Sequence, residues 1–283
     1  FPWWSDMLTD PFADDWLDIL QQRFRERPAA HALYVLVDGA FVPGLHRRIA
    51  ASRKVLLFEG LPASGPATLD VSPFILPFEP EDGALGPVLR ACRGWPMVSV
   101  IATSEPWRVV ATRLAPWCVI EADGQRFNFR FADTRRLPAI LKALDRGQRA
   151  QLAGPAVSWS YIGRDGNWST LVLDGTGDAI VTDPRLDDAQ FGTLVEDSRA
   201  DEVLARLAAH PNRSAYLPSQ AHALISSALA PALHAGMGDN ELVEWCSWLL
   251  AHYKRDDEKD IAGLFTAWKA HTLSMETVDA AET

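Results

Sequence analysis

The chain has 283 residues, of which 48% are hydrophobic and 23% are charged, so it can bury a core and is not disordered. Its formal net charge of −10 repels phosphate backbones, which argues against nucleic acid as a partner. No apolar run reaches the roughly 20 residues that span a bilayer, so we expect no membrane insertion. The chain has three cysteines, an odd number, and they are widely spaced: Cys92, Cys118 and Cys246. Such cysteines predict free thiols in a reducing compartment, and we expect a cytoplasmic protein.

Residues 1–28 are predicted to form an N-terminal helical arm. Asp10 is of a type that caps helices, and Pro11 suits the first helical position. An apolar stripe that includes Trp16 follows them at helical spacing. This stripe either docks on the rest of the chain or stays exposed for a partner. The second alternative makes Trp16 a candidate for a partner-binding surface.

Residues 29–180 are predicted to form a mixed α/β domain, in which helices pack on a mixed β-sheet. The continuous apolar run at 32–37 is typical of a strand that is covered on both faces. Residues 74–78 resemble a short strand with prolines around it, which predicts an edge position. Asp-Gly pairs at 123–124 and 165–166 predict two hairpins, because both residue types tolerate positive φ.

The stretch 117–144 is predicted to be a strand, a turn, a strand and a helix. Phenylalanines alternate with polar residues from 127 to 131, which is the period of a half-buried strand. Asp133 can cap the following helix. Pro138 would remove a hydrogen bond from a helix that began at Asp133. The helix therefore begins either at Asp133 or, after a looser turn, at Pro138.

Residues 181–283 are predicted to form an all-helical domain, because almost no strand pattern occurs beyond residue 186. Helices are expected at 187–210, 219–235, 240–253 and 258–273. Trp245, Trp248 and Trp268 fall on apolar stripes of the last two helices. These stripes either pack a small bundle or form a partner-binding surface, for which the three tryptophans are candidates.

The sequence contains no recognised motif for catalysis, a cofactor or a metal. A nucleophile elbow, a phosphate-binding glycine loop and a zinc-protease motif are all missing. The seven histidines show no spacing typical of a metal site. No nucleophile with a neighbouring base can be named. We therefore expect no enzyme activity, no cofactor and no metal.

Arg130, Asp133 and Arg135 are the charges of greatest interest. Arg130 lies on the polar side of the phenylalanine-bearing strand, and Arg135 follows the predicted capping aspartate by two residues. They form either an ion-paired junction between strand and helix or a contact for an anion or a partner.

Five sequence pieces, in this order, resemble the adaptor/effector-chaperone family of bacterial type VI secretion. They are YxLVDGA at 34–40, LFEG at 57–60, SPFIL at 72–76, Trp95 with the strand and Ser104 after it, and FRFADTR at 129–135. The same order continues through Trp159 and Trp168, so the resemblance covers roughly residues 31–170. Family members usually carry an aromatic residue at position 132, a proline at 134 and an apolar residue at 136. This chain has Ala, Thr and Arg there, so partner specificity is not transferred.

The resemblance implies an adaptor without catalysis, which binds a cognate toxic effector protein and loads it onto the spike protein. The resemblance also implies a family motif, whose residues either stabilise the fold or contact a partner. Its members are Phe129, Arg130, Phe131, Asp133 and Arg135. The helical domain would be the variable part and a candidate place for cargo recognition, and an acidic adaptor suits a basic cargo. Two other functions stay open, an immunity-type toxin inhibitor and an α/β enzyme with an unrecognised site.

Overall fold

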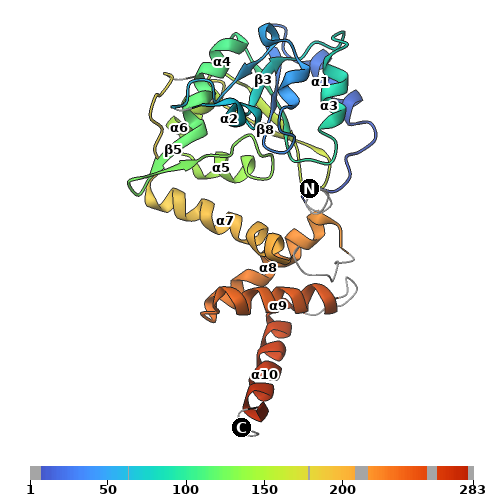
Figure 1. Cartoon of the computed structure of the whole chain (residues 1–283), viewed down its shortest axis with the longest axis vertical. Helices are drawn as coiled ribbons and strands as arrows, with labels where there is room; N and C mark the ends of the chain where they lie inside the picture. Colours follow the sequence, from blue (N-terminus) through green and yellow to red (C-terminus); the bar gives the residue numbers. More distant parts are fainter. Residues whose placement is uncertain (1–7, 63, 178, 208–215, 254–259, 280–283) are drawn as a thin grey trace. The chain divides into compact units, whose positions relative to one another are not determined.

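The computed structural model describes residues 8–62, 64–177, 179–207, 216–253 and 260–279 (Figure 1). The chain divides into two compact units, Leu8–Asp197 and a second unit whose described part begins at Ser198. The first unit combines a β-sheet with helices, and the second is helical. The predicted class, a mixed α/β fold followed by a helical region, is confirmed. No helix in the described ranges is long and apolar enough to cross a membrane.

A six-stranded sheet, in the order β2-β3-β1-β4-β7-β8, forms the centre of the first unit. Its strands are β1 (Ala32–Val37), β2 (Val55–Leu56), β3 (Phe74–Pro77), β4 (Val98–Thr103), β7 (Ser158–Ile162) and β8 (Trp168–Val172). Each neighbouring pair is antiparallel, so the sheet is antiparallel and not mixed as predicted. The central strands β1 and β4 are buried along almost their whole length, as the continuous apolar patterns predicted.

β3 is not an edge strand, so that prediction was wrong. It lies between β1 and β2, and β2 forms the edge with only two residues. Pro73 precedes β3 and Pro77 ends it, so both prolines lie outside the two positions that pair with β2. A proline at the end of a strand removes no ladder hydrogen bond that a neighbour needs.

Two apolar cores cover the two faces of the sheet, because side chains alternate between faces along each strand. One core packs under α4 (Trp107–Leu114), α5 (Leu137–Ala143) and α6 (Arg146–Ala153). The other packs under α1 (Trp16–Glu26) and α3 (Leu85–Ala91). The first unit is therefore a three-layer arrangement with the sheet in the middle (Figure 1).

The described part of the predicted N-terminal arm, residues 8–28, belongs to this unit. α1 begins at Trp16 and not at Pro11, and no side chain caps it. Asp10 is not the cap, because Asp15 is the residue that precedes α1. The amide of Asp10 donates to the Arg164 carbonyl at 2.7 Å. Residues 8–15 are thus tied to the hairpin of β7 and β8 before the helix starts.

The strand, turn, strand and helix predicted for residues 117–144 are present, with one difference in length. β5 (Val119–Ala122) and β6 (Gln125–Asn128) form the predicted hairpin. Its turn residues Asp123 and Gly124 have φ of 47° and 65°. The strand ends at Asn128 and not at residue 131, because the chain turns there and buries the next phenylalanines in the core. α5 begins at Leu137 with a proline in its first turn, which is the second of the two predicted starts.

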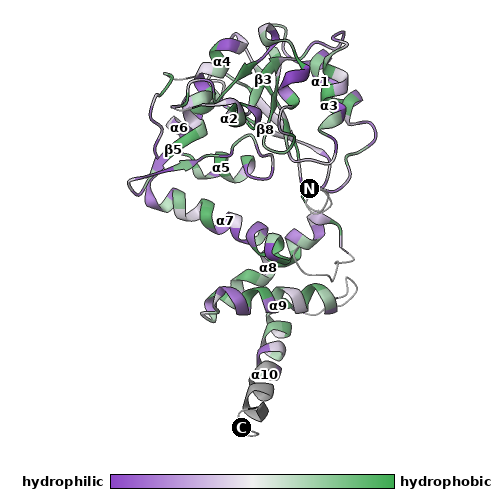
Figure 2. Ribbon diagram, viewed as in Figure 1, coloured by the Kyte–Doolittle hydropathy of each residue, from purple (hydrophilic) through white to green (hydrophobic). Residues whose placement is uncertain are grey.

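The remaining helices are α7 (Asp188–Leu207), α8 (Pro218–His234), α9 (Asp239–His252) and α10 (Ile261–Asp279), as the helical pattern predicted. The boundary between the units falls within α7 and not at residue 180. The connection before α7 belongs to the first unit because Pro184 and Leu186 bond the backbone of Glu121 in β5. In the second unit, hydrophobic residues recur between hydrophilic ones along α8 and α9 (Figure 2), and their apolar sides form one core.

Candidate functional site

Arg130, Asp133 and Arg135 come together with a fourth charged residue, Asp38, and we call these four the junction cluster. Asp38 directly follows β1, and the other three lie in the turn that joins β6 to α5. The turn approaches the end of β1 because the amide of Thr134 donates to the Pro96 carbonyl, at 3.0 Å, just before β4.

Two ion pairs organise the junction cluster. Arg130 donates from Nη2 to Oδ2 of Asp38 at 2.7 Å. Arg135 binds Asp133 through two nitrogens, with Nη2 at 2.7 Å from Oδ2 and Nε at 3.0 Å from Oδ1. Arg130 also lies 3.8 Å from Asp133 and so links the two pairs. The ion-paired junction, one of the two predicted alternatives, is therefore present.

The carboxylates of both ion pairs are buried. The side chains of Asp38 and Asp133 are only 3% and 2% exposed, whereas that of Arg130 is 39% exposed. Burial raises the pKa of Asp38, and the nearby Arg130 opposes that rise. Burial acts to lower the pKa of Arg130, but the two carboxylates outweigh it, so that pKa is raised. Arg130 thus remains a cation that joins a buried anion to the surface.

The direction of the Asp38 shift predicts a dependence of stability on pH. Asp38 binds its proton in the folded chain at a pH where the unfolded carboxyl is already ionised. Its contribution is therefore fully present below about pH 4 and is lost as pH rises through the raised pKa. We expect the wild type to lose free energy of unfolding relative to Asp38→Asn as pH rises from about 4 to 7. Urea titrations of both proteins check this, and a difference that is constant or grows with pH would contradict it.

An aromatic surface supports the two arginines. The guanidinium carbons of Arg130 and Arg135 lie 5.1 and 5.6 Å from the centre of the Phe41 ring. The Phe41 ring in turn packs against Trp95, with ring centres 5.9 Å apart. Stacking of this kind holds a guanidinium in one orientation, which favours bidentate pairing with a carboxylate.

The five sequence pieces of the resemblance meet around this cluster. The amide of Asp38, in the first piece, donates to the carbonyl of Met97, two residues beyond Trp95, at 2.9 Å. A Cβ on Gly39 would lie 2.3 Å from the carbonyl oxygen of Ser72, so only glycine fits there. Ser72 accepts at Oγ from the amide of Phe58 at 3.0 Å. The pieces thus build one connected structure, although they lie far apart in the sequence.

A pocket of about 90 Å³ adjoins the cluster and is lined by Asp38, Phe58, Cys118, Phe129 and Arg130, among others. Burial raises the pKa of the Cys118 thiol, so it is protonated and a poor nucleophile. In the described part of the chain, no group of three or more His, Cys, Asp or Glu residues could hold a metal ion. Chemically, the site offers one partly exposed guanidinium beside a buried carboxylate.

The three cysteines are free and buried, as the sequence predicted. Burial raises the pKa of Cys92 and that of Cys246 to about 12 each. Protonated thiols away from the surface pack as small apolar groups.

Two of the candidate tryptophans are not on a surface, so for these the packing alternative is confirmed and the partner-binding alternative is wrong. Trp16 is 3% exposed and packs in the core under α1, and Trp245 is fully buried in the helical core. Their large apolar area stabilises the chain itself. Trp248 and Trp268 are partly buried, and their ring centres lie 5.8 and 5.5 Å from that of Trp245.

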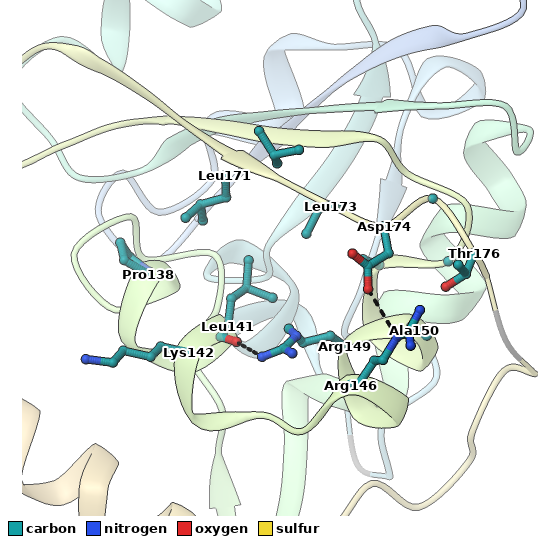
Figure 3. Close-up of a pocket in the computed structure, with 14 residues that line it drawn as sticks. Pro138, Leu141, Lys142, Arg146, Arg149, Ala150, Leu171, Leu173, Asp174 and Thr176 are labelled. Carbon is teal, nitrogen blue, oxygen red and sulfur yellow. Dashed lines mark hydrogen bonds and ion pairs between the residues drawn. The ribbon is translucent and has the colours of Figure 1, made fainter.

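Sequence reasoning missed a second pocket, of about 310 Å³, between α5, α6 and β8 (Figure 3). Its apolar lining includes Leu141 of α5 and Leu171 of β8, and its cations come from the two helices: Lys142, Arg146 and Arg149. The helical spacing of these three cations could be seen in the sequence. The position of β8 beside them could not be predicted, because it depends on the fold of the whole sheet.

The comparison with known families concerns the same region. Residues 33–151 match the model of a family described as a domain of unknown function, DUF4123. The DUF4123 match begins in β1, ends in α6 and contains all four residues of the junction cluster. It covers less than half of the chain, and the helical unit lies outside it. No curated protein and no solved structure matches the chain.

Proposed function

We propose that the protein is a type VI secretion adaptor, which binds a cognate toxic effector in the cytoplasm and loads it onto the spike protein without catalysis. The observation that carries this proposal is the DUF4123 match over residues 33–151, since this family model is associated with effector chaperones of that system. The matched stretch is also the one whose five sequence pieces resemble the adaptor family.

Within this proposal, the structure supports separate roles for the motif residues and for the surfaces outside the motif. The motif residues are largely buried and hold the β5–β6 hairpin to the sheet, so they act as framework. Cargo contacts are then made by surfaces outside the motif, such as the helical unit or the outer strand of the sheet. An adaptor needs a rigid platform that presents such a surface, because a preorganised surface loses less entropy on binding.

Deletion of the gene from the producing bacterium tests the proposal. We expect delivery of one effector to be abolished while the secretion machine continues to export its tube protein, and the full chain to co-purify with that effector. Loss of all export would contradict the adaptor role. Capture of the toxin's catalytic domain alone, with protection of a target cell, would favour an immunity-type inhibitor instead. Turnover of a substrate by the purified chain would favour an enzyme.

A further inference from the structure

β8 is the outer strand of the sheet, and one of its edges faces away from β7. The amide of Leu173 donates to the Val157 carbonyl at 3.0 Å, so the odd-numbered residues of β8 bond β7. The amides of Thr170 and Val172 therefore point outward. Within the ranges that the structure describes, neither amide has a backbone partner. The side chain of Val172 agrees with an open edge, because the residue is 86% exposed.

This edge lacks the features that usually prevent strand addition. β8 reads WSTLV, with no charged residue and no proline, and most of its residues favour strands. The opposite edge of the sheet, β2, has only two residues to offer. The contacts of β8 with α1 are made by side chains on one face of the sheet, since Trp168 donates from Nε1 to the Trp16 carbonyl at 2.8 Å and Thr170 accepts at Oγ1 from Nη1 of Arg23 at 2.8 Å. The open part is the end that carries Thr170 and Val172.

The second pocket lies beside this open end. Leu171 of β8 and Leu173, the residue directly after β8, face this pocket, as do Pro138 and Leu141 of α5 (Figure 3). A strand laid along β8 would place every second side chain over this apolar floor. Such a pocket next to an open edge is the arrangement by which extended peptides are recognised, with backbone bonds for affinity and pockets for selectivity.

Cations flank the apolar floor. In Figure 3, Lys142 extends away from the pair that Arg146 makes with Asp174. Nε of Arg146 lies 3.4 Å from Oδ2 of Asp174, and the two side chains are 76% and 61% exposed, respectively. Such an exposed ion pair is weak, so the carboxylate of a ligand can compete with Asp174 for Arg146. No ion pair of Lys142 occurs among the described residues. These cations are a local exception on a chain whose net charge is −10.

We propose that β8 and this pocket bind an extended segment of a partner protein, which adds one strand to the sheet. The segment would place apolar side chains over Leu171 and Leu173, with a carboxylate on each side for Lys142 and Arg146. The identification of that partner as the effector cargo rests on the proposed function. A second copy of this chain fits less well, because β8 carries no carboxylate for Lys142 and two copies repel each other.

A synthetic peptide tests the proposal on the full chain. The probe is acetyl-Glu-Thr-Val-Thr-Val-Thr-Glu-amide, whose glutamates and valines share one face of a strand. We expect saturable binding, slowed hydrogen exchange at the amides of Thr170 and Val172, and binding about tenfold or more weaker when both glutamates are lysines. Equal binding of the two peptides would overturn the proposal.

Backbone methylation of the peptide separates strand addition from simple charge attraction. Methyl groups on the three threonine amides block one alternating set of donors, and methyl groups on the valine and glutamate amides block the other. Either set can face β8, because a reversed peptide keeps its valines over the pocket but turns the other set toward β8. A peptide that is methylated on both sets must therefore lose binding, and retention of binding by that peptide would overturn strand addition.

Variants of the chain give a second readout. Val172→Pro removes an outward donor and leaves the bonds to β7 in place, whereas Val172→Thr keeps that donor as the matched control. We expect only the proline variant to lose the peptide. Lys142→Glu combined with Arg146→Glu should reverse the preference toward the lysine peptide, and Arg90→Glu on α3 should leave it unchanged. Circular dichroism checks that each variant is folded.

These experiments also separate the two proposals. If Val172→Pro captures the effector as well as the wild type does, strand addition is wrong and the adaptor role stands. If the peptides behave as expected but no effector is captured, strand addition stands and the adaptor role is wrong. A third outcome is that the wild type binds no peptide but forms a dimer that Val172→Pro abolishes. This outcome would show that the β8 edge pairs with a second copy of the chain, and it would overturn the proposal.

Discussion

Asp133→Ala is expected to lower the free energy of unfolding of the α/β unit by about 3–5 kcal/mol, the usual cost of removing one partner from a buried ion pair. The substitution leaves Arg135, whose side chain is 12% exposed, without the carboxylate that binds two of its nitrogens. It also removes the acceptor for the Arg135 amide at 3.1 Å. Urea unfolding followed by tryptophan fluorescence measures the loss.

A matched substitution and a double mutant show whether the loss comes from the buried charge. Asp14→Ala removes the carboxylate of the exposed pair with Arg93, and we expect a loss of at most about 1 kcal/mol. Arg135→Leu added to Asp133→Ala should recover part of the stability, because no buried charge then remains without a partner. Equal losses for Asp14→Ala and Asp133→Ala would contradict a central role for the junction cluster.

Trp245→Ala is expected to unfold the helical unit and to leave the α/β unit folded. Trp245 is fully buried, donates from Nε1 to the Ala228 carbonyl at 3.2 Å, and contacts the ring of Phe265. Truncation of such a tryptophan costs about 3–5 kcal/mol, which is comparable with the whole stability of a small helical bundle. Hydrogen exchange should show lost protection in α8 and α9 and retained protection in β1 and β4.

Trp248→Ala serves as the control, because Trp248 lies in the same helix but is only partly buried. We expect a smaller loss of stability and retained protection in α8. If Trp245→Ala removes protection from both units together, the two units unfold as one and the division at Asp197 has no energetic meaning.

Features that depend on a few neighbouring residues were readable from the sequence. Asp123 and Gly124 predicted a hairpin because that turn needs positive φ, and both residues have it. Pro138 lacks the amide that a helix interior needs, so it fits only in a first helical turn, and α5 begins at Leu137. The apolar periods likewise predicted the helices of the second unit, since a helix shows its buried side within two turns.

Only part of the candidate site could be predicted from the sequence. The charges of Arg130, Asp133 and Arg135 were identified, and Arg135 pairs with Asp133 two residues away. The partner of Arg130 was missed, since Asp38 lies 92 residues earlier in the chain. Asp38 belongs to the first sequence piece of the resemblance, but nothing in that piece identifies it as the partner of Arg130. Only the meeting of the end of β1 with the turn before α5 selects it.

The sequence by itself therefore determined the class of the fold, the hairpin turn at residues 123–124, the start of α5 and the charges that belong together locally. The tertiary structure alone decided that Trp16 and Trp245 are buried, that β3 lies inside the sheet and that β8 presents an open edge beside a pocket. The physical reason is that backbone geometry and periodicity act over a few residues. Burial and strand order depend on which distant segments pack together, and many segments of this chain are equally apolar.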